Sequence, residues 1–396
     1  MIRIEKPGRA AAPPPRGFAL FALGFRPFYL LASVFAALSV LLWITDYAGL
    51  VSIGYRRNPV WHAHEMLYGY TVAVIAGFLF TAVRNWTSRP TPTGGALAAL
   101  AALWLAGRVL VLTPYPLAAA IVNAAFPIAV AIGIAIPLVG SGNRRNYFFV
   151  ALLVLVGLAT LGVHLAYAGV IAWPARAGLQ VGLDVVLFIM AVMGGRVIPM
   201  FTNNGIPGLA ARRNPVLEKV ALGSVLLLLA ADVLQLPRSL VALVCLAAAA
   251  AHAARLFLWQ PWRTGGAPLV WILHASYLWI VVHLALRGSA LLGVGAEPLA
   301  THALTIGAIG GLTLGMMTRT ARGHTGRPLE ADTFEVACYL LVQAAAVVRV
   351  FGGWLLPGSY VGTVVLSGLL WAAAFAVYAV RYWPVLSRPR LDGKPG

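Results

Sequence analysis

Long apolar runs recur along almost the whole chain, and short stretches with proline, glycine or basic residues separate them. A helix needs about 20 apolar residues to cross the hydrocarbon core of a bilayer. Only 10% of the residues are charged, against roughly 25% in soluble domains. We therefore expect an all-α, polytopic integral membrane protein with about twelve transmembrane helices. The runs lie near residues 20–44, 61–83, 94–113, 116–139, 147–171, 177–200, 216–234, 238–258, 268–286, 299–318, 333–355 and 360–383.

A single transmembrane domain, residues 18–385, accounts for nearly all of the sequence. Residues 1–17 and 386–396 are interpreted as cytoplasmic tails. The N-terminal stretch is basic and proline-rich, and it lacks an apolar segment followed by a small-residue cleavage site. Cys245 and Cys338 lie inside apolar runs, so we expect them to be small core residues rather than a disulfide.

The net charge of +18 has an explanation in the membrane and does not indicate a nucleic-acid partner. Lysine and arginine gather in the cytoplasmic loops of membrane proteins. With the N-terminus inside, most of the basic loops between the predicted helices fall on that side. The asymmetry predicts that both termini are cytoplasmic and that the lipid bilayer is the main partner.

The histidines can be sorted by their expected depth in the bilayer. An ionisable side chain inside a membrane is costly, and it is therefore a candidate for function. The chain has 8 histidines, of which five are expected near the outer face and three toward the inner face. The outer set is His62, His64, His164, His283 and His302, and the inner set is His252, His274 and His324.

Imidazole nitrogens are common ligands of copper and of haem iron. A lone histidine in a membrane more often bonds a neighbouring helix, but five at one depth favour a metal site. The outer set therefore gives the candidate metal ligands. The sequence has no C-x-x-C-H motif, so any haem is expected to be b-type.

The stretch WHAHEM (61–66) opens the second predicted helix with two histidines and a glutamate. On a regular helix His62 and His64 point about 200° apart, whereas His62, Glu65 and Met66 share a face. Either the first turn is distorted and both histidines bind one ion, or the two histidines serve different neighbours.

Glu65 is the candidate catalytic residue, because a carboxylate can orient a ligand such as His62 or carry protons to a buried reaction. Its alternative role is an interfacial ion pair with Arg56 or Arg57. Asp184, near the outer end of the sixth predicted helix, is a second candidate for a proton path.

Two arginines, Arg26 and Arg108, lie within or near apolar runs. A guanidinium can bind the propionates of a haem, or it can reach the interface from a buried stem. Both residues are therefore candidates for cofactor binding.

Several long stretches together resemble the NnrS family, from about residue 17 to 385. They are GFRPFYLLA (24–32), WHAHEMLYGYTVAVIAGFLFTAVRNWT (61–87), GGRVIPMFTNNG (194–205), LHASYLW (273–279) and THALTIGAIGGLTLGMMTRTARGHTGRPL (301–329). The resemblance implies a bacterial inner-membrane protein that contains haem and copper and is associated with denitrification and nitric oxide stress. The histidines inside the matched stretches are His62, His64, His274, His302 and His324.

These observations favour a haem and copper protein that binds nitric oxide and reduces or detoxifies it. Glu65 would deliver protons, and quinol or an electron-donor protein would supply electrons. The haem candidates are His274, His302 and His324. The alternatives are a transporter or metal-handling protein, in which the histidines are transient sites, and a nitric oxide sensor without turnover.

Overall fold

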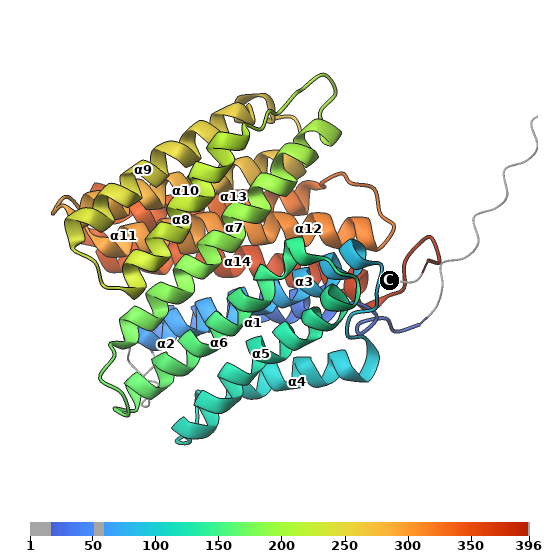
Figure 1. Ribbon diagram of the computed structural model, residues 1–396, viewed down its shortest axis with the longest axis horizontal. Helices are drawn as coiled ribbons and strands as arrows, with labels where there is room; N and C mark the ends of the chain where they lie inside the picture. The colour runs from blue at the N-terminus through green and yellow to red at the C-terminus, as the bar shows by residue number, and fades with distance from the viewer. Residues whose placement is uncertain (1–16, 51–58, 395–396) are drawn as a thin grey trace, which may run out of the picture.

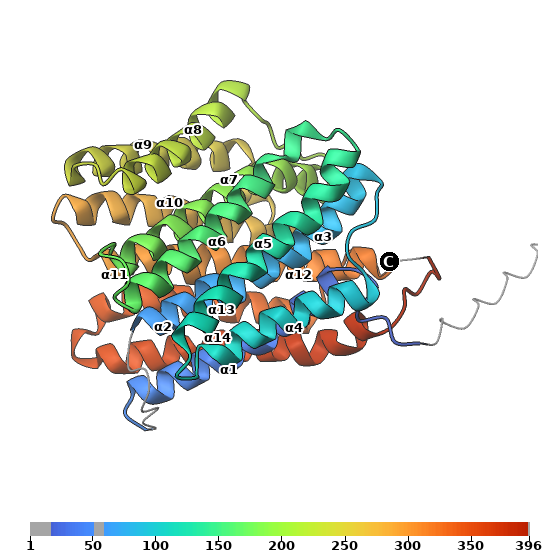
Figure 2. The same ribbon diagram turned by 60° about the horizontal axis from the view of Figure 1, so that its bottom comes forward.

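The computed structural model describes residues 17–50 and 59–394, and within these ranges it contains helices and no strands. Figure 1 shows them side by side in one bundle, and Figure 2 shows the same arrangement after rotation. Among the described residues, 10 helical segments are long and apolar enough to cross a membrane. The membrane fold is therefore confirmed.

The spanning segments follow the chain order of the apolar runs. The first five are α1 (Phe25–Tyr47), the continuous helix made of α2 (Pro59–His64), η1 (Glu65–Thr71) and α3 (Val72–Thr87), then α5 (Pro116–Gly140), η2 (Arg144–Asn146) with α6 (Phe148–Tyr167), and α7 (Ala175–Gly205). The others are α9 (Arg238–Leu258) with η3 (Pro261–Arg263), α10 (Pro268–Leu291), the continuous helix made of α11 (Glu297–His302), η4 (Ala303–Gly310) and α12 (Gly311–His324), then α13 (Thr333–Leu355), and α14 (Tyr360–Ser387) after the short η5 (Pro357–Ser359).

Two further helices occupy the remaining apolar runs. α4 (Gly94–Leu110) is shorter, with 17 residues. α8 (Pro215–Val233) has 19 residues but carries Glu218, Lys219 and Asp232. Each predicted run is therefore a helix, and a total of twelve membrane crossings stays a prediction.

Helix starts follow the local sequence. α5, α8 and α10 each begin with a proline. Proline lacks an N–H, and in the first turn of a helix an N–H has no acceptor within the helix, so proline is well tolerated there. Asn214 caps α8, and Asp332 and Glu335 form a reciprocal capping box at the start of α13. The very short predicted loops are confirmed as breaks, since α4 ends at Leu110 before α5 and α8 ends at Val233 before α9.

The two ends of the described chain meet at one end of the bundle. The Ala19 N–H donates to the Ser387 carbonyl at 2.7 Å, and Figure 1 shows the start of α1 beside the end of α14. We call this the terminal end, and the opposite one the far end. The predicted N-terminal tail lies almost wholly outside the described residues. A cytoplasmic location of the terminal end stays a prediction.

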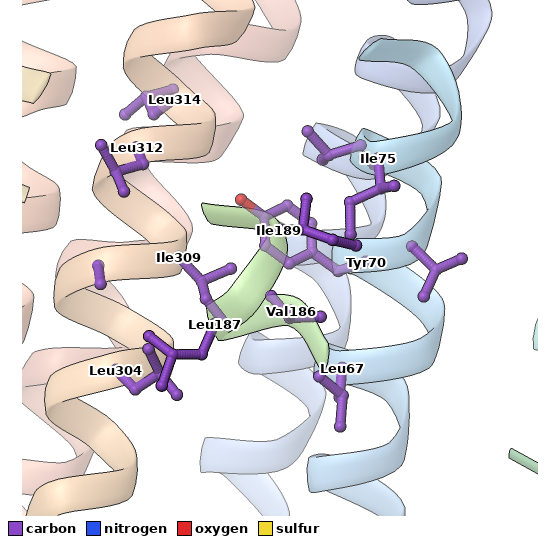
Figure 3. Packing of buried hydrophobic residues seen from close by; sticks show 14 of the residues in the cluster. Leu67, Tyr70, Ile75, Val186, Leu187, Ile189, Leu304, Ile309, Leu312 and Leu314 are labelled. Atoms are coloured by element: carbon purple, nitrogen blue, oxygen red, sulfur yellow. The ribbon is translucent and has the colours of Figure 1, made fainter. Parts of the chain in front are cut away.

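α7 lies at the centre of the bundle, between the two helices that contain η1 and η4. Val186, Leu187 and Ile189 of α7 lie between Leu67 on one side and Leu304 on the other (Figure 3). All of these side chains are buried. At this depth the apolar side chains of α7 lie between the two interrupted helices, which still meet directly where the hydroxyls of Tyr70 and Thr313 form a hydrogen bond.

Small residues allow the η4–α12 helix to approach α10 closely. A Cβ atom at Gly307 would overlap the ring of Trp279, and one at Gly311 would overlap the side chain of Ser276. Helix faces made of small residues are typical of closely packed transmembrane helices. Cys245 and Cys338 are buried free thiols, which confirms that they are core residues.

Candidate functional site

The first interrupted helix changes from α-helical to π-helical hydrogen bonding directly after His64. Within the wide turn, the Thr71 hydroxyl donates to the Met66 carbonyl at 2.8 Å. The Gly69 carbonyl also accepts the indole N–H of Trp104, on α4, at 2.9 Å. Single π turns inside helices are rare and often mark functional sites. The second interrupted helix shows the same change directly after His302.

Glu65 is buried, with 1% of its side chain exposed, and both of its oxygens are occupied. Oε1 lies 2.7 Å from Nδ1 of His64, and Oε2 accepts from the Arg108 guanidinium at 2.8 Å. Arg108, on α4, also donates to the side-chain carbonyl of Asn123, on α5. One carboxylate therefore balances one guanidinium in the apolar interior, which such a buried pair requires.

The prediction that Glu65 orients His62 is wrong, because the carboxylate bonds the adjacent ring of His64 instead. The physical reason is the start of η1 at Glu65, which ends the regular spacing on which the prediction rested. The alternative partners Arg56 and Arg57 lie outside the described residues. Within the described chain, Arg108 forms the ion pair.

His62 and His64 have different neighbours. The His62 ring stacks on Trp43 of α1, with centroids 4.9 Å apart and an interplanar angle of 12°, and it interacts electrostatically with His302. The His64 ring meets His164 of α6 edge to face at 4.7 Å. The structure therefore supports the second interpretation of WHAHEM, in which each histidine serves its own partner.

The positions of His62 and His324 along the bundle agree with the prediction. His62 contacts Trp43 near the far end of α1, whereas the His324 ring lies 5.7 Å from Phe25 at its start. Along α1 the two contacts are about 27 Å apart, at about 1.5 Å per residue. His62 and His324 thus lie at opposite ends of the bundle.

Oxygen acceptors fix the tautomer of several far-end histidines. A carbonyl or carboxylate can only accept, so the ring nitrogen that faces it must donate. Nδ1 faces the Glu65 carboxylate in His64 (2.7 Å), the Ala300 carbonyl in His283 (2.8 Å) and the Pro298 carbonyl in His302 (2.6 Å). In a neutral ring the lone pair is then on Nε2. Metal-binding histidines are commonly held in this way by an oxygen acceptor.

The candidate ligands meet in pairs and not in larger groups. Within residues 17–50 and 59–394, no set of three or more His, Cys, Asp or Glu side chains is placed to hold a metal ion. The His64 ring contacts the His164 ring, and His62 lies near His302 without a ring contact or hydrogen bond between them among the described interactions. Haem iron can take a single protein ligand, so single rings of this layer stay candidates for haem ligation, whereas the direct contact of His64 with His164 leaves no room for an iron between those two rings. The histidines of this layer do not fit a preformed copper site of three histidines.

His252, in the inner set, is explained without a metal. Its Nε2 faces the Ala221 carbonyl at 3.1 Å and must donate, so Nδ1 accepts from the Tyr277 hydroxyl at 2.6 Å. The Tyr277 oxygen in turn accepts from Arg255 at 2.8 Å. Both ring nitrogens are used, and the residue joins α8, α9 and α10.

His274 offers only one nitrogen to a cofactor. The Thr202 hydroxyl donates to the Ile198 carbonyl at 2.7 Å, so it accepts from Nε2 of His274 at 2.8 Å. Nδ1 of His274 is buried and has no hydrogen-bond partner in the described part of the chain. A haem role for His274 stays a prediction, and it would use Nδ1.

The two arginines predicted to bind a cofactor both hold protein groups. Arg26 is buried and donates to the Leu386 and Arg388 carbonyls at the end of α14, at 2.9 and 2.7 Å. Arg108 is held by Glu65. Their cofactor roles stay predictions.

A second buried polar cluster was only partly visible in the sequence. Arg287 of α10 joins Asp184 of α7 to Asp232 of α8, and of these only Asp184 was singled out. The signal that was missed is the combination of Asp184 and Asp232 inside their apolar runs with Arg287 directly after the run 268–286. Asn123, the partner of Arg108, was missed because an asparagine in an apolar run carries no charge to draw attention.

A comparison with known protein families gives a match to the family described as NnrS protein, over residues 19–390. The match covers nearly the whole chain, including the far-end histidine pairs and the helix that carries Arg108. A search of curated proteins finds no match.

Proposed function

Because the chain belongs to the NnrS family, which it matches over residues 19–390, we propose that it is a haem and copper protein of the bacterial inner membrane that binds and reduces nitric oxide. Family membership supports a membrane protein linked to nitric oxide. The observation that carries the proposal further is the far-end histidine layer, in which His64 and His302 turn Nδ1 toward oxygen acceptors.

The two histidine pairs are the proposed ligands. The His64 and His164 rings meet from different helices, and His62 and His302 lie near each other at the same end of the bundle. A bound haem or copper would supply the place where nitric oxide binds and accepts electrons. The chain itself orients the His64 ring, since the Glu65 carboxylate accepts from Nδ1, which puts the lone pair of the neutral ring on Nε2.

Glu65 is the proposed proton-delivery residue. Reduction of nitric oxide to nitrous oxide and water consumes one proton for each electron. The hydrogen bond between Nδ1 of His64 and Oε1 of Glu65 gives a short route for a proton between the two groups. Arg108 holds the carboxylate in place on its other side. Electrons would come from quinol or from an electron-donor protein.

Metal content and optical spectra of the purified protein test the ligand half. His62→Ala, His64→Ala or His302→Ala should each lower bound haem or copper. His252→Ala is the matched control, because both of its ring nitrogens already bond protein groups, and it should keep the metal. Wild-type metal content in all three far-end variants would remove these residues from the ligand set.

Nitrous oxide production tests the proton half. Glu65→Gln alone leaves Arg108 without its counter-ion, so it is measured beside the charge-balanced pair Glu65→Gln with Arg108→Gln. Both should keep most of the metal and reduce nitric oxide about 100-fold more slowly, because a general acid–base residue contributes about 100-fold or more in rate. Full turnover in both variants would leave Glu65 with a structural role only.

The same measurements separate the alternatives. A spectrum that changes with nitric oxide, without formation of nitrous oxide, would indicate a sensor. Protein that purifies without stably bound haem or copper would indicate a transporter or a metal-handling protein, in which the histidine pairs are transient sites along a path.

A further inference from the structure

Arg287, near the far end of α10, lies between a carboxyl group from α7 and another from α8. One of its terminal nitrogens donates to both oxygens of Asp232, at 2.7 Å each, and the other donates to Oδ1 of Asp184 at 3.2 Å. The Gln180 amide also donates to Oδ1 of Asp184, at 2.9 Å. Two acids therefore share one guanidinium.

The second carboxyl oxygen of Asp184 has no donor. Asp184 is fully buried, and its Oδ2 accepts no hydrogen bond from any residue that the structure describes. The Asp184 and Asp232 carboxyl groups are neighbours, because both accept from the same Arg287 guanidinium. Two ionised carboxylates cannot bond each other because neither has a hydrogen to donate. A proton on one of them supplies the missing hydrogen-bond donor.

The charge count leads to the same result. With both acids ionised the cluster has a net charge of −1, and one bound proton makes it neutral. The other titratable groups that face it are the Cys245 thiol on α9 and the His283 ring on α10. Nδ1 of His283 already donates to a backbone carbonyl, so the ring needs no extra proton. An uncompensated charge is costly in an apolar interior, and paired carboxylates commonly keep one proton.

We propose that Asp184 and Asp232 bind one exchangeable proton between them, and that this cluster is a second proton-binding site of the molecule. Arg287 fixes the two carboxyl groups in place. The Asp232 side chain is 14% exposed and that of Asp184 is 0% exposed. The proton therefore enters at Asp232 and is held toward Asp184.

α7 separates this cluster from the Glu65 site. The Tyr68 hydroxyl of η1 donates to the Gly178 carbonyl at 2.7 Å, and a Cβ atom at Gly182 would overlap Tyr68. Gln180 and Asp184 are two positions further along, which is a rotation of about 200° on an α-helix. They therefore face α10 from the opposite side of α7, and each site can be altered without touching the other.

Infrared spectroscopy of the full-length protein in lipid bilayers tests the proposal. A protonated carboxyl group has a C=O stretching band well separated from those of carboxylates, and the band shifts in D₂O. We expect such a band near neutral pH, and incorporation of ¹³C-aspartate should lower its frequency. The isotope experiment needs no substitution, so it identifies an aspartic acid even if a variant fails to fold.

Three variants assign the band. Asp184→Asn and Asp232→Asn each leave one acid with one guanidinium, so each should abolish the band. Arg287→Gln leaves two acids without a cation, so the band should grow about twofold. Asp332→Asn, at the partly exposed start of α13, is the control and should leave the band unchanged.

Other outcomes would overturn the proposal. These are an absent band near neutral pH, a band that ¹³C-aspartate does not shift, and a band that persists in both asparagine variants. If the band is absent and sodium ions stabilise the protein, the two acids bind a metal cation in place of the proton. The measurement does not depend on bound haem, copper or nitric oxide, so its failure would leave the proposed function untouched.

Discussion

Two buried carboxylate–arginine sites lie on opposite sides of α7, and they differ in their charge count. Glu65 faces Arg108 one to one, and donors occupy both carboxylate oxygens. Asp184 and Asp232 face Arg287 two to one, and one oxygen has no donor. Glu65 and Asp184 are equally inaccessible to water. The ratio of acids to fixed cations, and not burial alone, therefore decides which site needs a proton.

The largest expected effect comes from removing one acid at each site. Glu65→Gln leaves the Arg108 guanidinium, which cannot lose its proton, buried without a counter-ion. The loss in free energy of unfolding should be about 3–5 kcal/mol. Asp232→Asn leaves a balanced pair and should cost about 1 kcal/mol or less. Denaturant titration in mixed micelles measures both, and equal losses would break the comparison.

At the second site, removing both acids with Asp184→Asn and Asp232→Asn should destabilise the protein, although removing either acid alone should not. The first substitution removes the need for the proton, whereas the second leaves Arg287 unpaired. The double variant should therefore lose about 3 kcal/mol more than the sum of the single variants. Simple additivity in the same titrations would mean that Arg287 does not depend on either acid.

Charge balance can be restored at the first site. Adding Arg108→Gln to Glu65→Gln removes the stranded cation and keeps an amide beside Asn123. About 2 kcal/mol of the loss should be recovered, within the range measured for coupled neighbours. A double variant as unstable as the sum of its two single variants would show that the charges themselves are not coupled.

The smallest expected effect concerns the packing that positions Arg108. A Cβ atom at Gly69 would overlap the Arg108 guanidinium, so Gly69→Ala should displace it from Glu65 and cost about 1 kcal/mol. Gly223→Ala on α8 meets open space and serves as the control, with no loss or a small gain in stability. Equal effects at the two glycines would show that the guanidinium has room to move.

The helices could be predicted from the sequence because the length of an apolar run is a local property. Even the shortest breaks between helices are visible in the local sequence, as in the TPYP stretch, whose last residue, Pro116, begins α5. The ends of the bundle at which His62 and His324 lie could also be predicted from the order of the apolar runs. His62 and His324 were placed at opposite ends by counting runs, and their contacts with Trp43 and Phe25 agree.

The pairings inside the bundle could not be predicted, because they depend on which helices become neighbours. The partner of Glu65 is Arg108, on a different helix. The cluster around Arg287 takes one acid from α7 and one from α8. Spacing rules also failed locally at η1, since the Gly69 carbonyl there is bonded by Trp104, 35 positions later in the chain.

The π turn of η1 also has an evolutionary meaning. A turn closed by i→i+5 hydrogen bonds holds one more residue than an α turn, so it is equivalent to a single-residue insertion in a continuous helix. Each residue of an α-helix accounts for about 100° of rotation. Deleting one residue between Glu65 and Thr71 would restore a regular helix and rotate the turn of His62 and His64 by that angle against α3. One inserted codon is thus enough to redirect two histidines, while α3 keeps its orientation in the bundle.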